Sequence, residues 1–466
     1  MSEIHEDPKL TRARLVRVGA GAAASLTVLN APLLRSARAA PSAVVVRRSL
    51  ASLGSGHPIV TGYATAWAAM KALPTTDVHS WAYQAAIHGT ELAGSHVAWK
   101  TCEHGTHFFW SWHRMYLYYF ERIIRKYSGN PNWALPYWDY EQASQRALPV
   151  PFRTGGPLVV ANRGLGWNSG ASSLPGWAVD TSGGMGESNF FSAQSQLESI
   201  PHDQVHILVS GWMGDVPTAA QDPLFFVHHA NIDRLWNIWL AHGNPYSNPL
   251  SDSTWKTQTF TFFNENKKQV TLNACQILRA ADQLGYTYEG EPTQRKQFCL
   301  ILPPIVWKYL FRRIWLFREV IVLPRIPRPK PLPIDLASVR EQLVRAIRAK
   351  NQTVFLRLEG IRAKSSPNVV WQVFVSPREA PLDPEGPFFV GSVGLFSRGL
   401  PAHHDARPGS VDLPLDAALA RSLDSDELQM TFVPAGPLVR GKPSPAVPRA
   451  QVQIRRTSIV IETRTR

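Results

Sequence analysis

The sequence predicts a mainly α-helical core with short strands, built on a four-helix bundle and followed by a C-terminal all-β sandwich domain. Apolar residues recur at helical spacing through the first half of the chain. After residue 350, short alternating segments are separated by Gly, Pro and Asp, a pattern typical of a β-sandwich. The length of 466 residues, with 44% hydrophobic residues, indicates a globular protein of two or three domains.

The first 39 residues are interpreted as an export signal. Three arginines between residues 12 and 17 precede an apolar run at 18–34. The small-x-small pattern of residues 36–39 then predicts cleavage near Ala39 and a periplasmic or secreted protein. An amphipathic or disordered tail is the alternative, because adjacent twin arginines are missing. No later segment offers about 18 uncharged apolar residues, so we expect no stable membrane insertion.

Charge and composition divide the rest of the chain into three parts. We predict a core domain at 40–300, a basic Pro-rich linker at 301–334 and the β-sandwich at 335–466. Most of the net charge of +14 arises after residue 300, where 25 Lys and Arg face 14 Asp and Glu. The arginines there alternate with Pro and apolar residues and form no dense run, so we expect no nucleic-acid binding.

Periodicity and turn residues locate the elements within these parts. Helices are predicted at 64–72, 81–88, 107–127, 194–211 and 222–242, and a long surface connection at 149–189. Residues 254–272 alternate around the turn Asn264-Glu265-Asn266, which predicts a hairpin. Strands of the C-terminal domain are predicted at 353–358, 369–375, 388–396, 428–433 and 452–461.

Histidines gather in two short windows of the core. Of 15 His, five lie within residues 88–113 and four within 202–229. His202 and His206 are four residues apart, so on a helix both imidazoles face the same side and can bind one metal ion. Either His228 or His229 on the next helix offers a third ligand.

The ligand type narrows the choice of metal. Sites made only of imidazole suit copper, zinc, iron or nickel. Because no Cys pair or carboxylate set nearby matches a zinc or iron pattern, we expect copper. Two three-histidine sites on a four-helix framework predict a pair of metal ions.

Both windows resemble the copper-binding signatures of type-3 copper proteins, the family of tyrosinases, catechol oxidases (polyphenol oxidases) and haemocyanins. HGTHFFWSWHRMYLYYFE (104–121) is similar to the first signature. IPHDQVHILVSG (200–211) with DPLFFVHHANIDRLW (222–236) is similar to the second. The resemblance implies two copper ions, with His228 pointing elsewhere. The implied ligands are His88, His104 and His113 for one ion, and His202, His206 and His229 for the other.

The cysteines suggest a further feature of the first site. Cys102-Glu103-His104 resembles a segment in which many family members join the cysteine sulfur to the histidine through a thioether, and an unlinked buried thiol is the alternative. Cys102, Cys275 and Cys299 are odd in number and far apart, so we predict no disulfide framework. The paired N-terminal disulfides of plant enzymes are absent.

The resemblance also implies roles for residues around the copper ligands. Phe225, one turn before His229, would pack on that imidazole and fix its rotamer. Glu198 matches a glutamate that holds a water molecule in relatives. Asp203 stands where hydroxylating relatives often have Asn, and would orient a water or accept the phenol proton. Its alternative role is that of a charge at a helix N-terminus.

Two further positions are predicted with alternatives. Val216, thirteen residues before His229, stands where plant catechol oxidases often place a bulky gating Phe, so the smaller side chain would leave a more open entrance. Alternatively, Val216 only packs a loop. Asp233, one turn after His229, would orient a ligand from outside the coordination sphere, or pair with Arg234 on the surface.

The similarity to plant-type polyphenol oxidases covers nearly all of residues 45–466. Tyr286-Thr287-Tyr288 resembles a pair that closes the core near an N-terminal arginine, here Arg47 or Arg48, through a cation–π contact. FLRLEGI, WQVFVS and FFVGSVGLF resemble the C-terminal domain of latent plant enzymes. This implies a lid that inserts an apolar side chain over the copper cleft and is released by cleavage around 324–333. A permanent folding or secretion domain is the alternative.

The function that the resemblance implies is copper-dependent oxidation of o-diphenols to o-quinones by O2, with o-hydroxylation of monophenols. The expected partners are a phenolic small molecule and O2, with a copper-delivery protein as a further possible partner. An o-aminophenol oxidase on the same site and a haemocyanin-like O2 carrier remain alternatives.

Overall fold

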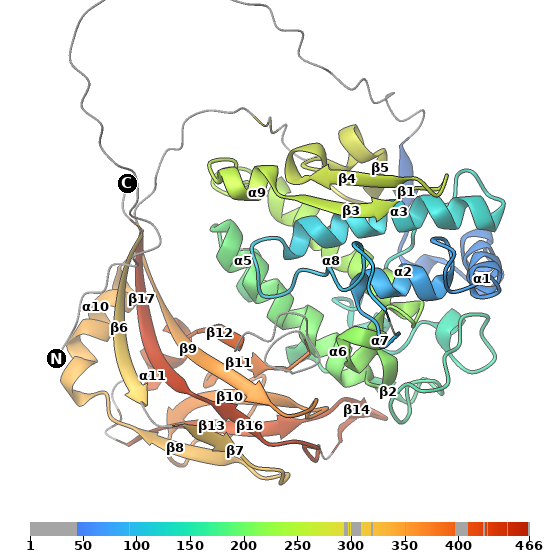
Figure 1. The fold of residues 1–466 in the computed structure, drawn as a ribbon. Coiled ribbons are helices and arrows are strands. Elements are labelled where there is room, and N and C mark those ends of the chain that lie inside the picture. The colour runs from blue at the N-terminus through green and yellow to red at the C-terminus, as the bar shows by residue number, and fades with distance from the viewer. Residues whose placement is uncertain are drawn as a thin grey trace, which may run out of the picture.

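A helical core and a β-rich domain lie side by side in the computed structural model (Figure 1). It describes residues 44–464 except 93, 293–296, 298, 300–308, 318, 319, 350, 397–408, 423, 424, 426 and 445. The predicted export signal therefore lies outside the described residues. None of the described helices is both long and apolar enough to cross a membrane.

The core is built mainly from helices whose starts are set by local capping. Helix α1 begins with Pro58 at its first position, and the His57 side chain accepts a hydrogen bond from the backbone N–H of Ile59. Ser80 caps α2 in the same way. The helices are α1 (Pro58–Lys71), α2 (Trp81–His88), α3 (Phe109–Ser128), α4 (Ser182–Gly186), α5 (Phe190–Leu197), α6 (Gln204–Val209), α7 (Val216–Ala219), α8 (Leu224–Ala241) and α9 (Ser253–Thr257).

One predicted helix of the core is interrupted. The sequence predicts a helix over 194–211, whereas the structure has α5, the π-helical segment η5 (Glu198–Asp203) and α6. The break occurs at Ile200, which has extended backbone angles before Pro201. Proline disfavours helical angles at the preceding residue and lacks the N–H that would continue the ladder, so the chain changes direction here.

Short strands complete the core. β1 (Val45–Arg47) pairs in parallel with β5 (Tyr286–Tyr288), which brings the two ends of the core together. β3 (Thr259–Phe263) and β4 (Gln269–Asn273) form the predicted hairpin. Its first strand begins at residue 259, because α9 occupies the residues before it. Cys275 and Cys299 form a disulfide, a pairing that the sequence analysis did not predict.

In its described residues, the β-rich domain contains two main sheets and two α-helices. One sheet has the order β11-β10-β13-β8 and the other β6-β17-β9-β16-β7, with β12 paired to β9. The elements are β6 (Tyr309–Phe317), β7 (Ile321–Leu323), β8 (Lys330–Ile334), α10 (Arg340–Arg348), β9 (Gln352–Ala363), β10 (Val370–Pro377), β11 (Phe389–Val393), β12 (Gly409–Pro414), α11 (Asp416–Ser422), β13 (Leu428–Ala435), β16 (Val452–Ile454) and β17 (Arg456–Arg464).

The prediction of a linker over residues 301–334 is wrong for residues 309–334. Strand β6 pairs with β17, β7 with β16 and β8 with β13, so all three belong to the β-rich domain. The prolines were misleading because β8 lies at the edge of its sheet, where a missing N–H is tolerated. Cleavage around 324–333 would therefore cut within the domain and would not separate it from the core.

The two domains are joined by a shared sheet and by buried side chains. β14 (Leu438–Val439) pairs with β15 (Lys442–Pro443) and also with β2 (Ser172–Ser173) of the core. Val370 and Phe396 are buried in the hydrophobic cluster of the core, whereas the neighbouring Leu395 belongs to the cluster of the β-rich domain. The β-rich domain therefore contributes side chains directly to the interior of the core.

Candidate dinuclear metal centre

Three histidines from separate elements form the first cluster. His88 is the last residue of α2, His113 lies in the first turns of α3, and His104 lies on the loop before α3. The ring centroid of His104 is 5.1 Å from that of His88 and 5.2 Å from that of His113. The structure thus brings together the three residues that the sequence predicted for one site.

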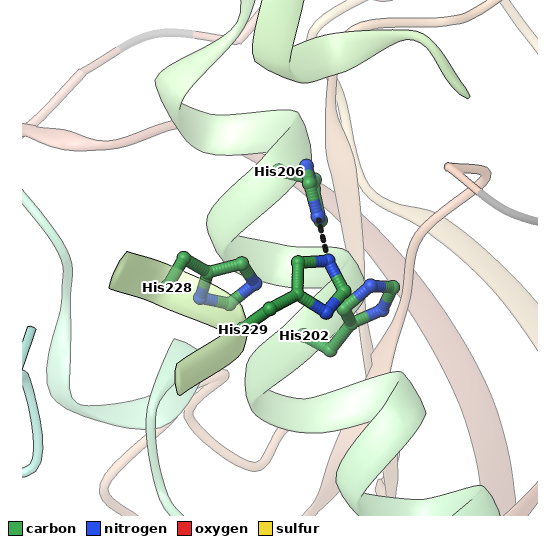
Figure 2. A group of neighbouring side chains, drawn as sticks. All are labelled: His202, His206, His228 and His229. Atoms are coloured by element: carbon green, nitrogen blue, oxygen red, sulfur yellow. Dashed lines mark hydrogen bonds between the residues drawn. The ribbon is translucent and has the colours of Figure 1, made fainter. Parts of the chain in front are cut away.

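The second cluster contains four histidines (Figure 2). His202 lies in η5, His206 in α6, and His228 and His229 in α8. One possible ligand atom from each lies within 4.8 Å of the others. His228 was expected to point elsewhere, but it joins this group, so that expectation is wrong. Its Nδ1 lies 3.1 Å from the hydroxyl oxygen of Tyr140.

The two clusters adjoin in the middle of the core. The rings of His113 and His229 are stacked, with centroids 4.4 Å apart and planes at 9°. The Nε2 atoms of His206 and His229 lie 3.3 Å apart, the contact drawn in Figure 2. His88, His113 and His229 also form a group whose ligand atoms lie within 4.8 Å. One continuous imidazole-lined centre therefore spans both clusters.

Backbone carbonyl groups fix the orientation of the imidazoles. Nδ1 of His88 donates to the carbonyl oxygen of Val216 at 3.1 Å, and Nδ1 of His206 donates to that of Met213 at 2.8 Å. Nδ1 of His113 donates within its own helix to the carbonyl oxygen of Phe109 at 2.8 Å. When Nδ1 is the donor, Nε2 carries the lone pair that a metal ion needs.

The buried centre fits a pair of copper ions. Burial lowers the pKa of His113, His206, His228 and His229 well below the usual range, and neighbouring histidines lower it further. Their imidazoles are therefore neutral at pH 7 in the absence of metal. Within the described part of the chain, Nε2 of His113 and Nε2 of His228 are buried without a hydrogen-bond partner. Neutral, convergent imidazole nitrogens are the donor set that suits copper.

Glu198 and Cys102, two residues from the sequence analysis, lie at the loop that carries His104. Glu198 is buried, and its Oε1 accepts a hydrogen bond of 2.6 Å from the backbone N–H of Gly105. Cys102 is buried and outside any disulfide, and its Sγ lies within 4.8 Å of a ring nitrogen of His104. Burial raises the pKa of the Cys102 thiol well above its usual value. The implied thioether stays a prediction.

Three other predicted residues also border the centre. The ring centroid of Phe225 lies 4.1 Å from that of His229 and 4.7 Å from that of His88. Oδ1 of Asp203 is 3.0 Å from Nδ1 of His202, so this carboxylate orients a candidate ligand. The side chain of Val216 is buried, and its carbonyl oxygen is the acceptor for His88.

Asp233 neither orients a ligand nor pairs with Arg234, the two roles predicted for it. Its carboxylate accepts hydrogen bonds from Arg114 at 2.5 Å, Arg47 at 3.2 Å and the hydroxyls of Tyr286 and Tyr288, both at 2.6 Å. Burial by itself would raise the pKa of Asp233, but the two guanidinium groups outweigh it and lower the pKa below its usual value. The residue thus anchors a buried charge network and orients no histidine.

That network shows which N-terminal arginine closes the core. The guanidinium carbon of Arg47 lies 3.6 Å from the ring centroid of Tyr286 and 5.5 Å from that of Tyr288. Arg48 pairs instead with Glu289 at the surface. Arg234, the alternative partner for Asp233, bonds to Glu141.

Phe396 of the β-rich domain is a neighbour of the centre that the sequence did not identify. Its ring stacks on His206 with centroids 3.8 Å apart and planes at 5°. The centroids of His202 and His104 lie 5.6 and 6.0 Å away. The residue ends the motif FFVGSVGLF, but no spacing rule distinguishes it from the other aromatic residues there. The carbonyl acceptors of Val216 and Met213 have no sequence signal either, because every residue carries one.

Comparisons with known proteins were consistent with this geometry. The profile of the common central domain of tyrosinase matches residues 78–189 and 179–242, which contain all six predicted ligands. The profile of the polyphenol oxidase middle domain matches residues 250–298.

Curated relatives share this central region. A tyrosinase from Hahella sp. (strain CCB-MM4) is 36% identical over 281 residues, covering 48% of this chain and 59% of the relative. A latent chloroplastic polyphenol oxidase from Prunus armeniaca is 30% identical over 293 residues, covering 50% of this chain and 48% of the relative. The chain thus spans about half the length of these relatives.

Solved structures resemble the whole described fold. Latent apple tyrosinase superposes with a TM-score of 0.64 at 22% identity, covering 91% of this chain and 98% of that one. A latent aurone synthase gives the same TM-score at 20% identity, covering 91% of this chain and 90% of that one. At these identities the likeness supports the arrangement of a helical core beside a β-rich domain. Independently of these structures, the profile matches across the histidine clusters show that residues 78–298 are similar to the tyrosinase and polyphenol oxidase family, whose members hold a pair of copper ions.

Proposed function

We propose that this protein oxidises o-diphenols to o-quinones with O2 and also o-hydroxylates monophenols. The observation that carries the proposal is the continuous imidazole-lined centre, in which the rings of His113 and His229 from opposite clusters stack at 4.4 Å. Donor sets so close together suit two metal ions that act on one substrate.

We assign three ligands to each copper ion. His88, His104 and His113 hold one, and His202, His206 and His229 hold the other. The copper pair supplies the electron transfer between O2 and the phenol. The protein keeps the imidazoles neutral by burial and keeps their Nδ1 atoms bonded to fixed acceptors, so that the nitrogens facing the metal are arranged before it binds.

Proton handling is assigned to the carboxylates beside the second cluster. A phenol has a pKa of about 10, so a base is needed to form phenolate near neutral pH. Asp203 is the candidate base for monophenols, because it lies against His202 at the edge of that cluster. Glu198 holds the His104 loop through Gly105 and borders the same cluster. Val216 is assigned to the substrate entrance.

The β-rich domain is assigned the role of a lid, with Phe396 as the blocking side chain. The parallel stacking of its ring on His206 occupies the position that a phenol ring would take beside this cluster. Its burial among core residues excludes water from the imidazoles. The full chain is therefore proposed to be latent. We further infer export, and a copper-delivery partner that acts before the lid closes.

The test uses copper-loaded full-length protein and its Phe396→Ala variant, each assayed with catechol and with tyrosine. Quinone formation from catechol, and from tyrosine after a lag, is the expected result in the variant. Turnover of o-aminophenol alone would support the aminophenol oxidase. Reversible O2 binding without turnover of any substrate, in both proteins, would overturn the proposal and favour a carrier.

A further inference from the structure

A cavity lies outside the histidine centre, where α1, the start of α2 and the segment 211–221 meet. It has a volume of about 190 Å³. Its walls include Trp67 and Lys71 from α1, Trp81 from α2, and Trp212 and Gln221 from the segment. This volume is small beside the 300–1,000 Å³ typical of ligand sites, so the cavity suits a single ring with a short side chain.

The lining offers flat apolar surfaces and one donor without a partner. Three of the five residues named above are tryptophans, and Trp212 is 37% exposed at the rim. The Nε1 of Trp81 already donates to the carbonyl oxygen of Gln221 at 2.9 Å. By contrast, Nε1 of Trp67 is buried with no hydrogen-bond partner in the part of the chain that the structure describes. Indole faces of this kind favour an aromatic ring as the ligand.

A single positive charge stands beside these rings. Nζ of Lys71 lies 4.5 Å from the ring centroid of Trp67, and Lys71 forms no ion pair with any acidic side chain among the described residues. The nearest acidic residue along this part of the chain, Asp77, is paired with Lys267. The cavity therefore offers one unneutralised ammonium group and matches an anion with one negative charge.

The same segment that walls the cavity also serves the metal centre. Trp212 precedes Met213, whose carbonyl oxygen is the acceptor for His206. Val216, four residues further on, is the acceptor for His88. The cavity thus borders the segment whose backbone orients one imidazole of each cluster.

We propose that this cavity is a binding site for small aromatic carboxylates, separate from the metal centre. The ring of the ligand packs against the indoles that line the cavity, and its carboxylate meets the ammonium group of Lys71. A carboxylate is favoured over a phosphate because one lysine is the only cation of the lining, and phosphate sites typically combine several donors. The proposal does not depend on the proposed oxidase activity.

Metal-free full-length protein is the sample for the test, because Phe396 covers the imidazoles there and no copper is present to bind the probe. The probe is 3-phenylpropanoate, which has no phenolic hydroxyl and cannot be oxidised as a phenol. Titration calorimetry and tryptophan fluorescence should both report saturable binding with one site per chain. The uncharged amide of the probe should bind at least about tenfold more weakly, since it loses the charge-assisted contact.

Three variants separate this cavity from other sites. Lys71→Met should weaken binding of 3-phenylpropanoate about tenfold or more, while Lys71→Arg retains most of it. Lys268→Met, which removes another exposed lysine on the β4 side of the hairpin, should leave the affinity unchanged and serves as the matched control. Thermal unfolding of each variant checks that the fold is retained. Absence of saturable binding, or equal affinity in Lys71→Met and the original protein, would overturn the proposal.

Discussion

At the scale of single residues, a neutral imidazole offers a metal one nitrogen while its other nitrogen needs a hydrogen-bond partner of its own. His88, His113 and His206 meet this need through backbone carbonyl oxygens, and His202 lies against Asp203. His228 differs, because its Nδ1 partner is a side chain, the hydroxyl of Tyr140. Its ring also lies within the second cluster, so metal analysis of variants at both positions tests the assignment of His229.

The first prediction addresses that choice. His229→Ala should lower the copper content from two ions per chain to about one, since His229 contacts both clusters. His228→Ala should keep both ions and serves as the matched control. Metal analysis of the purified proteins measures the difference. Loss of copper from His228→Ala, with retention in His229→Ala, would reverse our ligand assignment.

The second prediction concerns the carboxylate beside His202. In a Phe396→Ala background, Asp203→Ala should reduce monophenol hydroxylation by about 10²-fold, because a positioned base contributes on that order, and should reduce catechol oxidation much less. Parallel kcat measurements with tyrosine and catechol give the ratio. Equal losses with both substrates would show that Asp203 only orients His202.

At the scale of elements, spacing predicted helices that are continuous and failed where a local residue interrupts one. Helix α2 has the predicted bounds, and the resemblance of residues 200–211 to a copper signature placed His202 and His206 together even though η5 breaks the predicted helix. The strands β6 to β8 were missed because their prolines and arginines suggest a linker when read locally. Only their pairing with strands more than 90 residues away shows that they belong to a sheet.

The contact between α2 and α7 leads to the third prediction. A Cβ atom at Gly89 would lie 2.6 Å from the carbonyl oxygen of Val216, the acceptor for His88. Gly89→Ala should therefore displace this acceptor, lower the free energy of unfolding by about 1–3 kcal/mol and weaken copper binding. Gly56→Ala, where a Cβ meets no atom within 4 Å, is the control. Thermal unfolding and copper titration measure both effects, and wild-type values for Gly89→Ala would contradict the expectation.

At the scale of the whole molecule, a buried charge network closes the core and a second domain covers its centre. Arg47 joins Glu121 and Asp233, while Asp233 also binds Arg114, and all four groups are buried. The contact of the Tyr-x-Tyr pair with an N-terminal arginine could be predicted from the sequence, but the anchoring role of Asp233 and the choice of the arginine that enters the core could not. Both Arg47 and Arg48 fit the sequence pattern, and only the burial of one side chain by β1 decides between them.

The fourth prediction tests this network. Arg47→Ala leaves Glu121 and Asp233 buried with fewer partners and should lower the free energy of unfolding by about 3–5 kcal/mol. Arg48→Ala removes the neighbouring exposed arginine, whose pairing with Glu289 is worth at most about 1 kcal/mol. Denaturant unfolding compares the pair. Similar midpoints for the two variants would rule out a special role for Arg47.

The fifth prediction concerns latency. Removing the ring of Phe396 should raise catechol turnover about tenfold or more without changing copper content, because a tethered blocker acts at high effective concentration. Leu395→Ala is the matched control, since its side chain packs in the core of the β-rich domain and leaves the imidazoles covered. Equal activation by both variants would point to general loosening of the domain, and no activation by Phe396→Ala would exclude it as the blocker.

The pairing of β1 with β5 has a consequence for how the molecule is put together. Strands from the start and the end of the core lie side by side in parallel register, Val45 opposite Tyr286 and Arg47 opposite Tyr288. The first and last strands of the core are therefore paired with each other. The β-rich domain follows β5 in the chain, after this pairing of the core is complete. Sequence can be added or exchanged beyond β5 without breaking this pairing, whereas loss of the β-rich domain would uncover the edge of β2 and the core surface packed under Val370 and Phe396. A short bridge between residues 45 and 288 would allow the chain of the core to be reopened at another loop.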